Sequence, residues 1–396
     1  MTSTFCILPW MHIATNSTGN LRVCCNAVPT KGYIYKSDGN PYKLFRDDIN
    51  EAWHSKTYKN IRQDFLNGNK PEICERCFRE EDAGLKSARQ SANEQWGTEC
   101  SMTTTPEMDI RYVDLRLGNL CNLKCRMCNP YSSSIWTKEW NKVVTEEEQI
   151  SQDEVTRLAQ LDWPTKDKTW DNIKEILPSV EMIYFTGGEP TLTLEQMSLL
   201  EYCVNNEYTD IILKYNTNLT NIPERILDLW KNFKKIRINA SIDAIGDLNR
   251  YIRYPSSWEE ITNNLDILKN IPNVHVGIHT TVQMYNIFDL HNIIAYFKDY
   301  NHFLNILNHP KHLNIRVLNK KHKQKILNRL LTCPVHNVST TTIADRIEGI
   351  IKYMQEDWHD KWPAFVAYTK NVDKQRNENI LDHIEEFNED CDDWKS

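Results

Sequence analysis

Beyond residue 109, short apolar segments alternate with longer segments of helical periodicity. The short segments are rich in β-branched residues and span Ile110–Leu117, Met182–Phe185, Ile211–Tyr215, Ile236–Ile242, Val274–Val282 and Leu313–Leu318. Amphipathic stretches lie between most of them, at Leu194–Asn206, Pro223–Phe233, Trp258–Asn270 and Phe288–Tyr300. Strands that alternate with helices form parallel sheets through right-handed crossovers. Six strands rather than eight predict an α/β fold with a partial (β/α)6, TIM-like barrel over residues 106–320.

The segments on either side of this barrel have different patterns. Two Gly- and Asn-containing turns, at Ser17–Asn20 and Ser37–Asn40, predict hairpins, and Ala52–Leu66 has a helical pattern. Residues 1–105 are therefore predicted to form a small N-terminal module. Helical periodicity at Lys320–Leu331 and Ile343–Trp358 predicts a C-terminal helical extension over residues 321–396.

Composition and charge narrow the class of protein. The 396 residues include 47 basic and 54 acidic side chains, a formal charge of −7, and 40% are apolar. The chain can bury a large core, and this charge makes double-stranded DNA an improbable primary partner. It has no apolar run of about 20 residues and no signal-peptide pattern, so we expect a cytoplasmic protein without a membrane partner. Twelve cysteines in a reducing compartment then indicate metal binding rather than disulfides.

Three of these cysteines follow the first predicted barrel strand. Cys121, Cys125 and Cys128 have the spacing CxxxCxxC. Three thiolates can hold three irons of a four-iron cluster and leave the fourth iron open to a chelating substrate. A structural zinc site usually has four ligands, and the next cysteine, Cys203, lies in a helical pattern. Because barrel active sites gather at the carboxyl ends of the strands, this position favours the iron–sulfur interpretation.

A Gly-Gly-Glu-Pro turn ends the second predicted strand, at residues 187–190. The glycines allow a close approach of the backbone, and the carboxylate can accept a hydrogen bond from an ammonium group. Alone, such a turn fits an ordinary strand-to-helix connection equally well. Together, the CxxxCxxC and GGEP motifs resemble the radical S-adenosylmethionine (SAM) superfamily, over about residues 109–320.

The resemblance implies both a reaction and a set of site residues. In that family, the open iron chelates the amine and carboxylate of SAM, and the GGEP turn receives the amine. Reductive cleavage then gives methionine and a 5′-deoxyadenosyl radical that abstracts hydrogen from a substrate. The residues that match SAM-contacting positions are Met127, Thr186, Gly187, Gly188, Glu189, Ser241, Arg253 and Leu318. Of these, Arg253 could instead be a surface arginine.

A second cysteine set lies in the N-terminal module. Cys6 and Cys24 flank Gly19 with the spacing Cx12Gx4C, and Cys74 and Cys77 form a CxxC. Four thiolates suit zinc and an iron–sulfur cluster equally. The pattern resembles the auxiliary-cluster module of SPASM and twitch radical SAM proteins, here placed before the barrel as in N-terminal-twitch members. This resemblance implies a second 4Fe-4S cluster held by Cys6, Cys24, Cys74 and Cys77.

Other cysteines complicate or complete this assignment. Cys25 could replace Cys24 as a ligand or act as a redox-active neighbour. Four more cysteines are interpreted as ordinary thiols: Cys100, Cys203, Cys333 and Cys391.

The leading functional hypothesis is a radical SAM enzyme that oxidises or otherwise modifies a polar substrate. Relatives with this module commonly act on peptides or proteins. One phase of the predicted strands is polar, which favours a polar substrate: Asp114, Arg116, Asn239, Ser241, His279, Thr281, Gln283 and Arg316. The expected partners are a flavodoxin- or ferredoxin-type electron donor and a peptide or polar small molecule.

Two alternatives remain at this point. The basic segment 319–325 would suit modification of RNA or a nucleotide, although a solvated helix face explains it as well. A non-catalytic iron–sulfur sensor or scaffold would bind clusters without cleaving SAM. No residue pattern identifies an acid, a base or the hydrogen that is abstracted.

Overall fold

The computed structural model describes residues 3–29, 31–82, 86–97, 100–332 and 343–394. Its strands follow the order β2-β1-β3-β4-β5-β6-β7-β8 in one sheet. Their bounds are β1 His12–Thr15, β2 Leu21–Arg22, β3 Tyr112–Arg116, β4 Met182–Thr186, β5 Ile212–Thr217, β6 Lys235–Ser241, β7 Val274–Val282 and β8 Asn301–Ile306. The β1/β3, β3/β4, β4/β5 and β7/β8 pairs are parallel, and β1/β2 is antiparallel. The predicted α/β class with an open, mostly parallel sheet is confirmed.

Helices follow most of the strands, as the amphipathic stretches predicted. Their bounds are α1 Ile49–Trp53, α2 Lys56–Leu66, α3 Glu75–Asp82, α4 Ala88–Trp96, α5 Trp140–Val143, α6 Gln152–Ala159, α7 Asp167–Ile176, α8 Leu194–Asn205, α9 Glu224–Trp230, α10 Gly246–Ile252, α11 Trp258–Lys269, α12 Leu290–Tyr296, α13 Lys320–Leu331, α14 Ile343–Met354, α15 Trp362–Arg376 and α16 Cys391–Trp394. Among the described residues, no helix is both long enough and apolar enough to cross a bilayer.

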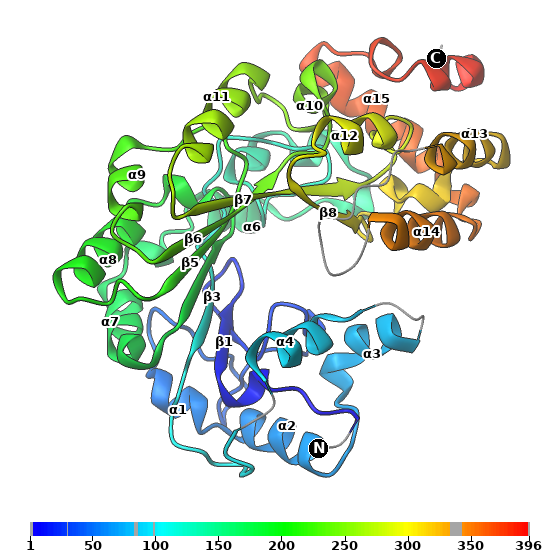
Figure 1. Ribbon diagram of the computed structural model, residues 1–396. Coiled ribbons are helices and arrows are strands. Elements are labelled where there is room, and N and C mark those ends of the chain that lie inside the picture. The colour runs from blue at the N-terminus through cyan, green and yellow to red at the C-terminus, as the bar shows by residue number, and fades with distance from the viewer. Residues whose placement is uncertain (1–2, 30, 83–85, 98–99, 333–342, 395–396) are drawn as a thin grey trace. The chain divides into compact units, whose positions relative to one another are not determined.

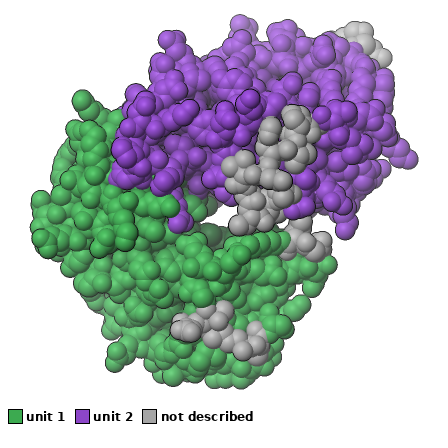
Figure 2. All heavy atoms as spheres, in the orientation of Figure 1, with its two compact units in different colours: residues 1–120, 160–215, 223–236 green, residues 121–159, 216–222, 237–396 purple. Residues whose placement is uncertain are grey.

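The chain divides into two compact units, coloured separately in Figure 2. Unit 1 comprises residues 1–120, 160–215 and 223–236. Unit 2 comprises residues 121–159, 216–222 and 237–396. The GGEP turn and the N-terminal cysteines thus lie in unit 1, whereas the CxxxCxxC loop and the C-terminal helices lie in unit 2.

In unit 1, strand alternation separates an apolar face from a polar one. Val113, Leu115, Ile183, Phe185 and Leu213 are buried on one face. Helices α7, α8 and α9 lie along one side of this unit (Figure 1). Removing such apolar surface from water contributes roughly 25 cal/mol per Å². The opposite face carries the polar residues of the same strands.

The N-terminal segment extends the sheet of unit 1. Strand β1 runs parallel to β3, with Ala14 opposite Asp114, and the β1/β2 hairpin turns at Gly19. Gly19 has a φ of +76°, and a β-carbon there would lie 2.7 Å from the Phe45 ring and 2.9 Å from Trp163. Only glycine fits both the left-handed conformation and the close ring contact. Both predicted hairpin turns are present, because Tyr35 also bridges to Pro41 around the second one.

The prediction of the sixth barrel strand is wrong. Leu313–Leu318 forms 3-10 turns, over Lys311–Leu313 and Ile315–Val317, and the last strand is instead β8. The side chain of Asn314 accepts a hydrogen bond from the backbone N–H of Arg316, which closes a turn where alternation of apolar residues suggested a strand. In β8, His302 and Leu304 are buried while Asn301, Phe303 and Asn305 are exposed, so polar residues hid the strand pattern.

Candidate functional site

The CxxxCxxC loop lies in unit 2, which begins at Cys121, whereas the preceding residue Leu120 belongs to unit 1. Cys125 is buried, and Cys121 and Cys128 are half-buried. The hydrogen bond between the Cys125 and Cys128 thiols lowers the pKa of Cys125, and the guanidinium of Arg253 acts in the same direction. The backbone N–H of Cys128 donates to the carbonyl of Cys125 at 3.0 Å. The loop therefore gathers at least two thiols beside a buried cation, an arrangement that suits thiolate ligands.

The carbonyl groups of this loop are held by side chains from distant segments. The Ser133 hydroxyl donates to the Leu123 carbonyl at 2.6 Å, and the Trp136 indole donates to the Cys125 carbonyl at 3.0 Å. From α15, Arg376 donates to the Lys124 carbonyl at 2.7 Å. The Tyr368 hydroxyl donates to the Arg126 carbonyl, also at 2.7 Å. The cysteine loop is thus fixed in part by a helix that lies about 250 residues later in the chain.

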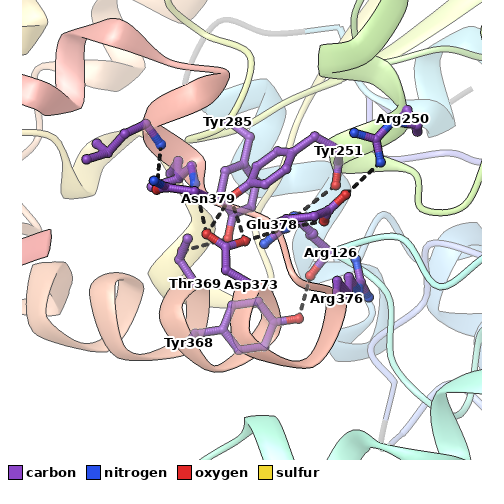
Figure 3. A network of polar contacts seen from close by, with 12 residues as sticks. Arg126, Arg250, Tyr251, Tyr285, Tyr368, Thr369, Asp373, Arg376, Glu378 and Asn379 are labelled. Carbon is purple, nitrogen blue, oxygen red and sulfur yellow. Dashed lines mark hydrogen bonds and ion pairs between the residues drawn. The ribbon is translucent and has the colours of Figure 1, made fainter.

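Arg126, which lies between Cys125 and Met127, is the centre of a buried polar network (Figure 3). Its side chain is 0% exposed, and its guanidinium pairs with Asp373 at 2.6 Å and with Glu378 at 2.8 Å. The same guanidinium lies 3.5 Å from the centre of the Tyr251 ring. Its Nε also donates to the Tyr251 carbonyl. Sequence reasoning missed this role, because no local pattern links Arg126 to partners in the C-terminal extension.

We expect the Arg126→Met variant to lose about 3–5 kcal/mol of unfolding free energy. The change leaves the buried Asp373 without its cation and leaves Glu378 with Arg250 alone, and an uncompensated buried charge is costly. Anaerobic urea denaturation measures the loss. Neutralising both carboxylates as well, with Asp373→Asn and Glu378→Gln, should restore part of it. A loss below about 1 kcal/mol would show that the network contributes little.

The GGEP turn follows β4 in unit 1. Gly187 and Gly188 have φ values of +88° and +52°. A β-carbon on Gly188 would lie 2.1 Å from the carbonyl oxygen of Leu120, so the turn is packed against the residue that precedes Cys121. The backbone N–H of Glu189 donates to this same carbonyl at 2.7 Å. The glycines are therefore required by a close approach of two backbone segments.

Glu189 and Thr186 also make contacts within unit 1. Glu189 is 1% exposed, and its Oε1 accepts hydrogen bonds from the hydroxyl and the backbone N–H of Thr191, at 2.8 Å and 3.3 Å. The Thr186 hydroxyl, at the end of β4, donates to the Leu115 carbonyl at 3.5 Å. Glu189 thus orders the start of the following turn, and its role towards an ammonium group stays a prediction.

The remaining residues predicted to contact SAM lie in unit 2. Arg253 is no surface arginine: it is 9% exposed and forms a 2.8 Å ion pair with Asp243, whose side chain is fully buried. Ser241, at the end of β6, and Met127 are half-buried. Leu318 follows a 3-10 turn and is completely buried, so the strand position that suggested it does not exist.

The four predicted auxiliary cysteines line one cavity in unit 1. Cys6, Cys24, Cys74 and Cys77 share its walls mainly with apolar side chains, among them Leu8, Val23 and Phe65. Burial raises the pKa of the Cys6 thiol to about 12 and also raises that of Cys74. Thiols in such surroundings become thiolates only beside a positive centre such as a metal. The chemistry of these four donors therefore suits a metal centre. Their thiols are not gathered around one point, since within the described residues no three or more His, Cys, Asp or Glu side chains could hold a single metal ion.

Cys25 is exposed and lies beside both the Cys24 thiol and the Asp114 carboxyl of β3. The contact with the Cys24 thiol is the main cause that raises the pKa of Cys25. Cys25 does not belong to the residues that line the cavity, whereas Cys24 does and also accepts from the backbone N–H of Asn26 at 3.2 Å. Of the cysteines interpreted as ordinary thiols, Cys203 is buried on α8 and Cys100 is half-buried. Cys333 and the side chain of Cys391 lie outside the described residues.

We expect Cys24→Ala and Cys25→Ala to differ in the iron that they retain. With only Cys6, Cys74 and Cys77 left, the auxiliary cluster should become labile, so Cys24→Ala should lose up to about four irons per chain. Cys25→Ala should keep the full complement. Iron and sulfide analysis after anaerobic reconstitution and desalting measures the cluster content of both variants. If Cys25→Ala loses iron and Cys24→Ala keeps it, then Cys25 is the ligand.

Comparisons with known proteins agree with this arrangement. The Radical SAM superfamily model matches residues 115–297, and the SPASM model, an iron-sulfur cluster-binding domain, matches residues 6–78. An uncharacterized protein, MJ0907 of Methanocaldococcus jannaschii, is 26% identical over 195 residues, or 47% of this chain. The chain spans 58% of the length of that relative.

Similar solved structures include a peptide complex. TYW1 with a lysine-pyruvate adduct is 17% identical, with a TM-score of 0.31, over 59% of this chain and 74% of that one. Streptococcus suis SuiB bound to precursor peptide SuiA is 12% identical, with a TM-score of 0.30, over 82% and 83%. Both superpositions are loose.

The matched domains have known cofactors. A radical SAM domain binds a 4Fe-4S cluster and SAM, and a SPASM domain binds auxiliary iron–sulfur clusters. The expected order, with the auxiliary module before the barrel, is confirmed by the matched ranges. Residues 115–297 therefore match the radical SAM superfamily, and residues 6–78 match a SPASM-type iron–sulfur domain that precedes them in the chain.

Proposed function

We propose that this chain cleaves SAM reductively and uses the resulting radical to oxidise or modify a peptide or protein. The observation that carries the proposal is the presence in one chain of two separate cysteine sets, each in its own matched domain. When bound, the cluster and SAM supply a low-potential electron and a 5′-deoxyadenosyl radical. The expected electron donor is a flavodoxin- or ferredoxin-type protein.

The chain's own residues would bind, orient and shield these groups. Cys121, Cys125 and Cys128 would hold the SAM-binding cluster, and Gly187, Gly188 and Glu189 would receive the amine. Met127, Thr186, Ser241 and Arg253 complete the proposed SAM contacts, and Leu318 is left out because the strand end that suggested it is absent. Arg253 lies close enough to Cys125 and Cys128 to influence both thiols, which supports its place beside the cluster.

The auxiliary site would have a separate role. Cys6, Cys24, Cys74 and Cys77 would ligate the second 4Fe-4S cluster, and their shared cavity supports this assignment. A fully ligated cluster offers no open iron to substrate, so we propose electron transfer as its task. The proposed domain ranges are 1–105 for this module, 106–320 for the barrel and 321–396 for the helical extension.

The nucleic-acid alternative is weakened by the contacts of the basic segment. Lys321 and Lys325 on α13 both pair with Glu389, and Lys323 donates to the Glu356 carbonyl at 2.7 Å. These contacts support the interpretation of the segment as a solvated helix face, in which exposed lysine–carboxylate pairs each contribute only about 0–1 kcal/mol. A peptide or protein substrate is therefore the better proposal.

The test uses anaerobically purified protein reconstituted with iron and sulfide. Iron is counted per chain, dithionite and SAM are added, and 5′-deoxyadenosine is measured. Roughly eight irons and deoxyadenosine formation would support the proposal, since each cubane contains four irons. Clusters without any cleavage would favour the sensor or scaffold function instead. About four irons with one zinc and intact cleavage would overturn the second cluster alone.

A further inference from the structure

Arg376 is the last residue of α15, and its side chain is completely buried against the cysteine loop of unit 2. Its Nη2 donates at 2.7 Å to the carbonyl of Lys124, the residue directly before Cys125. Its guanidinium lies 4.9 Å from the centres of both the Trp136 and the Tyr254 rings. The Trp136 indole in turn donates to the Cys125 carbonyl. The end of α15 therefore packs on the stretch of backbone that carries the second cysteine of the CxxxCxxC motif.

The charge of Arg376 is only partly balanced by its neighbours. Among the described residues, the carboxylate within ion-pair distance is that of Glu139, at 3.5 Å, and Glu139 lies closer to Lys124, at 2.6 Å. Burial, and after it the nearby Arg126, lowers the pKa of Arg376, whereas Glu139 and Glu378 act in the opposite direction. A guanidinium still remains protonated at neutral pH. Arg376 is therefore a buried cation that shares its nearest carboxylate with a lysine.

Two nitrogens of Arg376 fit a further acceptor. Its Nε and Nη1 are buried and have no hydrogen-bond partner in the part of the chain that the structure describes. Buried N–H groups are nearly always paired, so these donors fit an anionic group beside the loop. The hydrogen bond with the Cys128 thiol is the main cause that lowers the pKa of Cys125, and the cations of Arg253 and Arg376 act in the same direction. A cluster ligated by thiolates, Cys125 among them, is such an anionic group.

We propose that Arg376 is a positioning residue of the SAM-binding cluster: it fixes the cysteine loop at the Lys124 carbonyl, and its cation raises the reduction potential of the cluster. The inference rests on the proposed function, because it takes Cys121, Cys125 and Cys128 as the ligands of that cluster. Net charge and hydrogen bonding set the potential of an iron–sulfur cluster, and a buried cation favours the reduced, more negative form. The C-terminal extension thereby favours the one-electron reduction that precedes SAM cleavage.

The test is a redox titration of the reconstituted holoenzyme, followed by electron paramagnetic resonance of the reduced clusters. The signal that changes when SAM is added identifies the SAM-binding cluster. Arg376→Met removes the cation, and Arg376→Lys keeps one. Tyr368→Phe removes another hydrogen bond from α15 to the loop, at the Arg126 carbonyl, without changing a charge. Arg329→Met is the matched control, because Arg329 on α13 also donates to a backbone carbonyl, that of Phe288 at 3.0 Å, and also pairs with a carboxylate.

At a fixed solution potential, Arg376→Met should lower the ratio of reduced to oxidised SAM-binding cluster about tenfold, which corresponds to about 59 mV for a one-electron couple. Arg376→Lys, Tyr368→Phe and Arg329→Met should stay within about threefold of the wild type, because each keeps the cation beside the loop. Glu139→Gln leaves the cations of Arg376 and Lys124 without their shared carboxylate and should raise the ratio. If Arg376→Met does not retain its cluster, the direction of the Glu139→Gln shift decides.

Four results would overturn the inference. They are an unchanged ratio in Arg376→Met, an equal fall in Arg376→Lys, an equal fall in Tyr368→Phe, and a fall in Glu139→Gln. A wild-type holoenzyme with neither a SAM-responsive signal nor deoxyadenosine formation would instead overturn the proposed function, on which the inference rests. Wild-type cleavage together with unshifted ratios in the variants would overturn the role of Arg376 alone.

Discussion

The Cys121→Ala/Cys125→Ala/Cys128→Ala variant is expected to lose SAM cleavage while keeping about half of its iron. The three thiols are the proposed ligands of the cluster that binds SAM, and groups that act as one unit fail together, so deoxyadenosine formation should fall at least about a thousandfold. The auxiliary cysteines lie in a separate cavity in unit 1 and should retain roughly four irons. Iron analysis and chromatography of deoxyadenosine measure the two effects.

Two comparisons make this result specific. Cys100→Ala removes a half-buried thiol whose contact is the Met102 sulfur, at 3.7 Å, so it should keep both the iron and the cleavage of the wild type. The mirror variant, with Cys74 and Cys77 replaced by alanine, should also lose about half of its iron but keep the SAM-binding cluster. Cleavage that persists in the Cys121/Cys125/Cys128 variant would mean that SAM binds elsewhere.

Local sequence pattern predicted most of the fold, because apolar alternation and turn residues reflect the structure around them. Strands β3 to β7 and both hairpin turns lie where the pattern indicated. The last strand was missed because an Asn314 side chain can close a turn within an apolar segment, which alternation alone does not reveal. Edge strands such as β8 carry polar residues and have a weaker apolar signal.

The parts of the site that consist of residues close together in the sequence could be predicted. The cysteine motifs and the GGEP turn are local, whereas the partners of Arg126 lie 247 and 252 residues away. No spacing rule connects such positions, so this network is visible only in three dimensions.

We expect Gly188→Ala to abolish most SAM cleavage without removing the clusters' cysteine ligands. Its φ of +52° costs an alanine about 1–2 kcal/mol. The new β-carbon would also overlap the Leu120 carbonyl oxygen, 2.1 Å away, and overpacking costs about 1–3 kcal/mol more. To relieve the overlap, the turn must move away from the residue before Cys121. A displacement of about 1 Å can cost a hundredfold in rate, so we expect at least that loss of deoxyadenosine formation.

The Gly246→Ala variant distinguishes the effect of the Gly188–Leu120 contact from the effect of a positive φ. Gly246 has a φ of +57°, nearly that of Gly188, but a β-carbon there would meet nothing within 4 Å. The Gly246→Ala variant should therefore lose only the free energy needed to hold an alanine at this positive φ, about 1–2 kcal/mol of unfolding free energy. It should keep most of its cleavage rate. Anaerobic denaturation and the deoxyadenosine assay compare the two variants. If Gly188→Ala cleaves SAM as fast as Gly246→Ala, then the contact between Gly188 and Leu120 does not position the site, and the glycine is needed for its conformation alone.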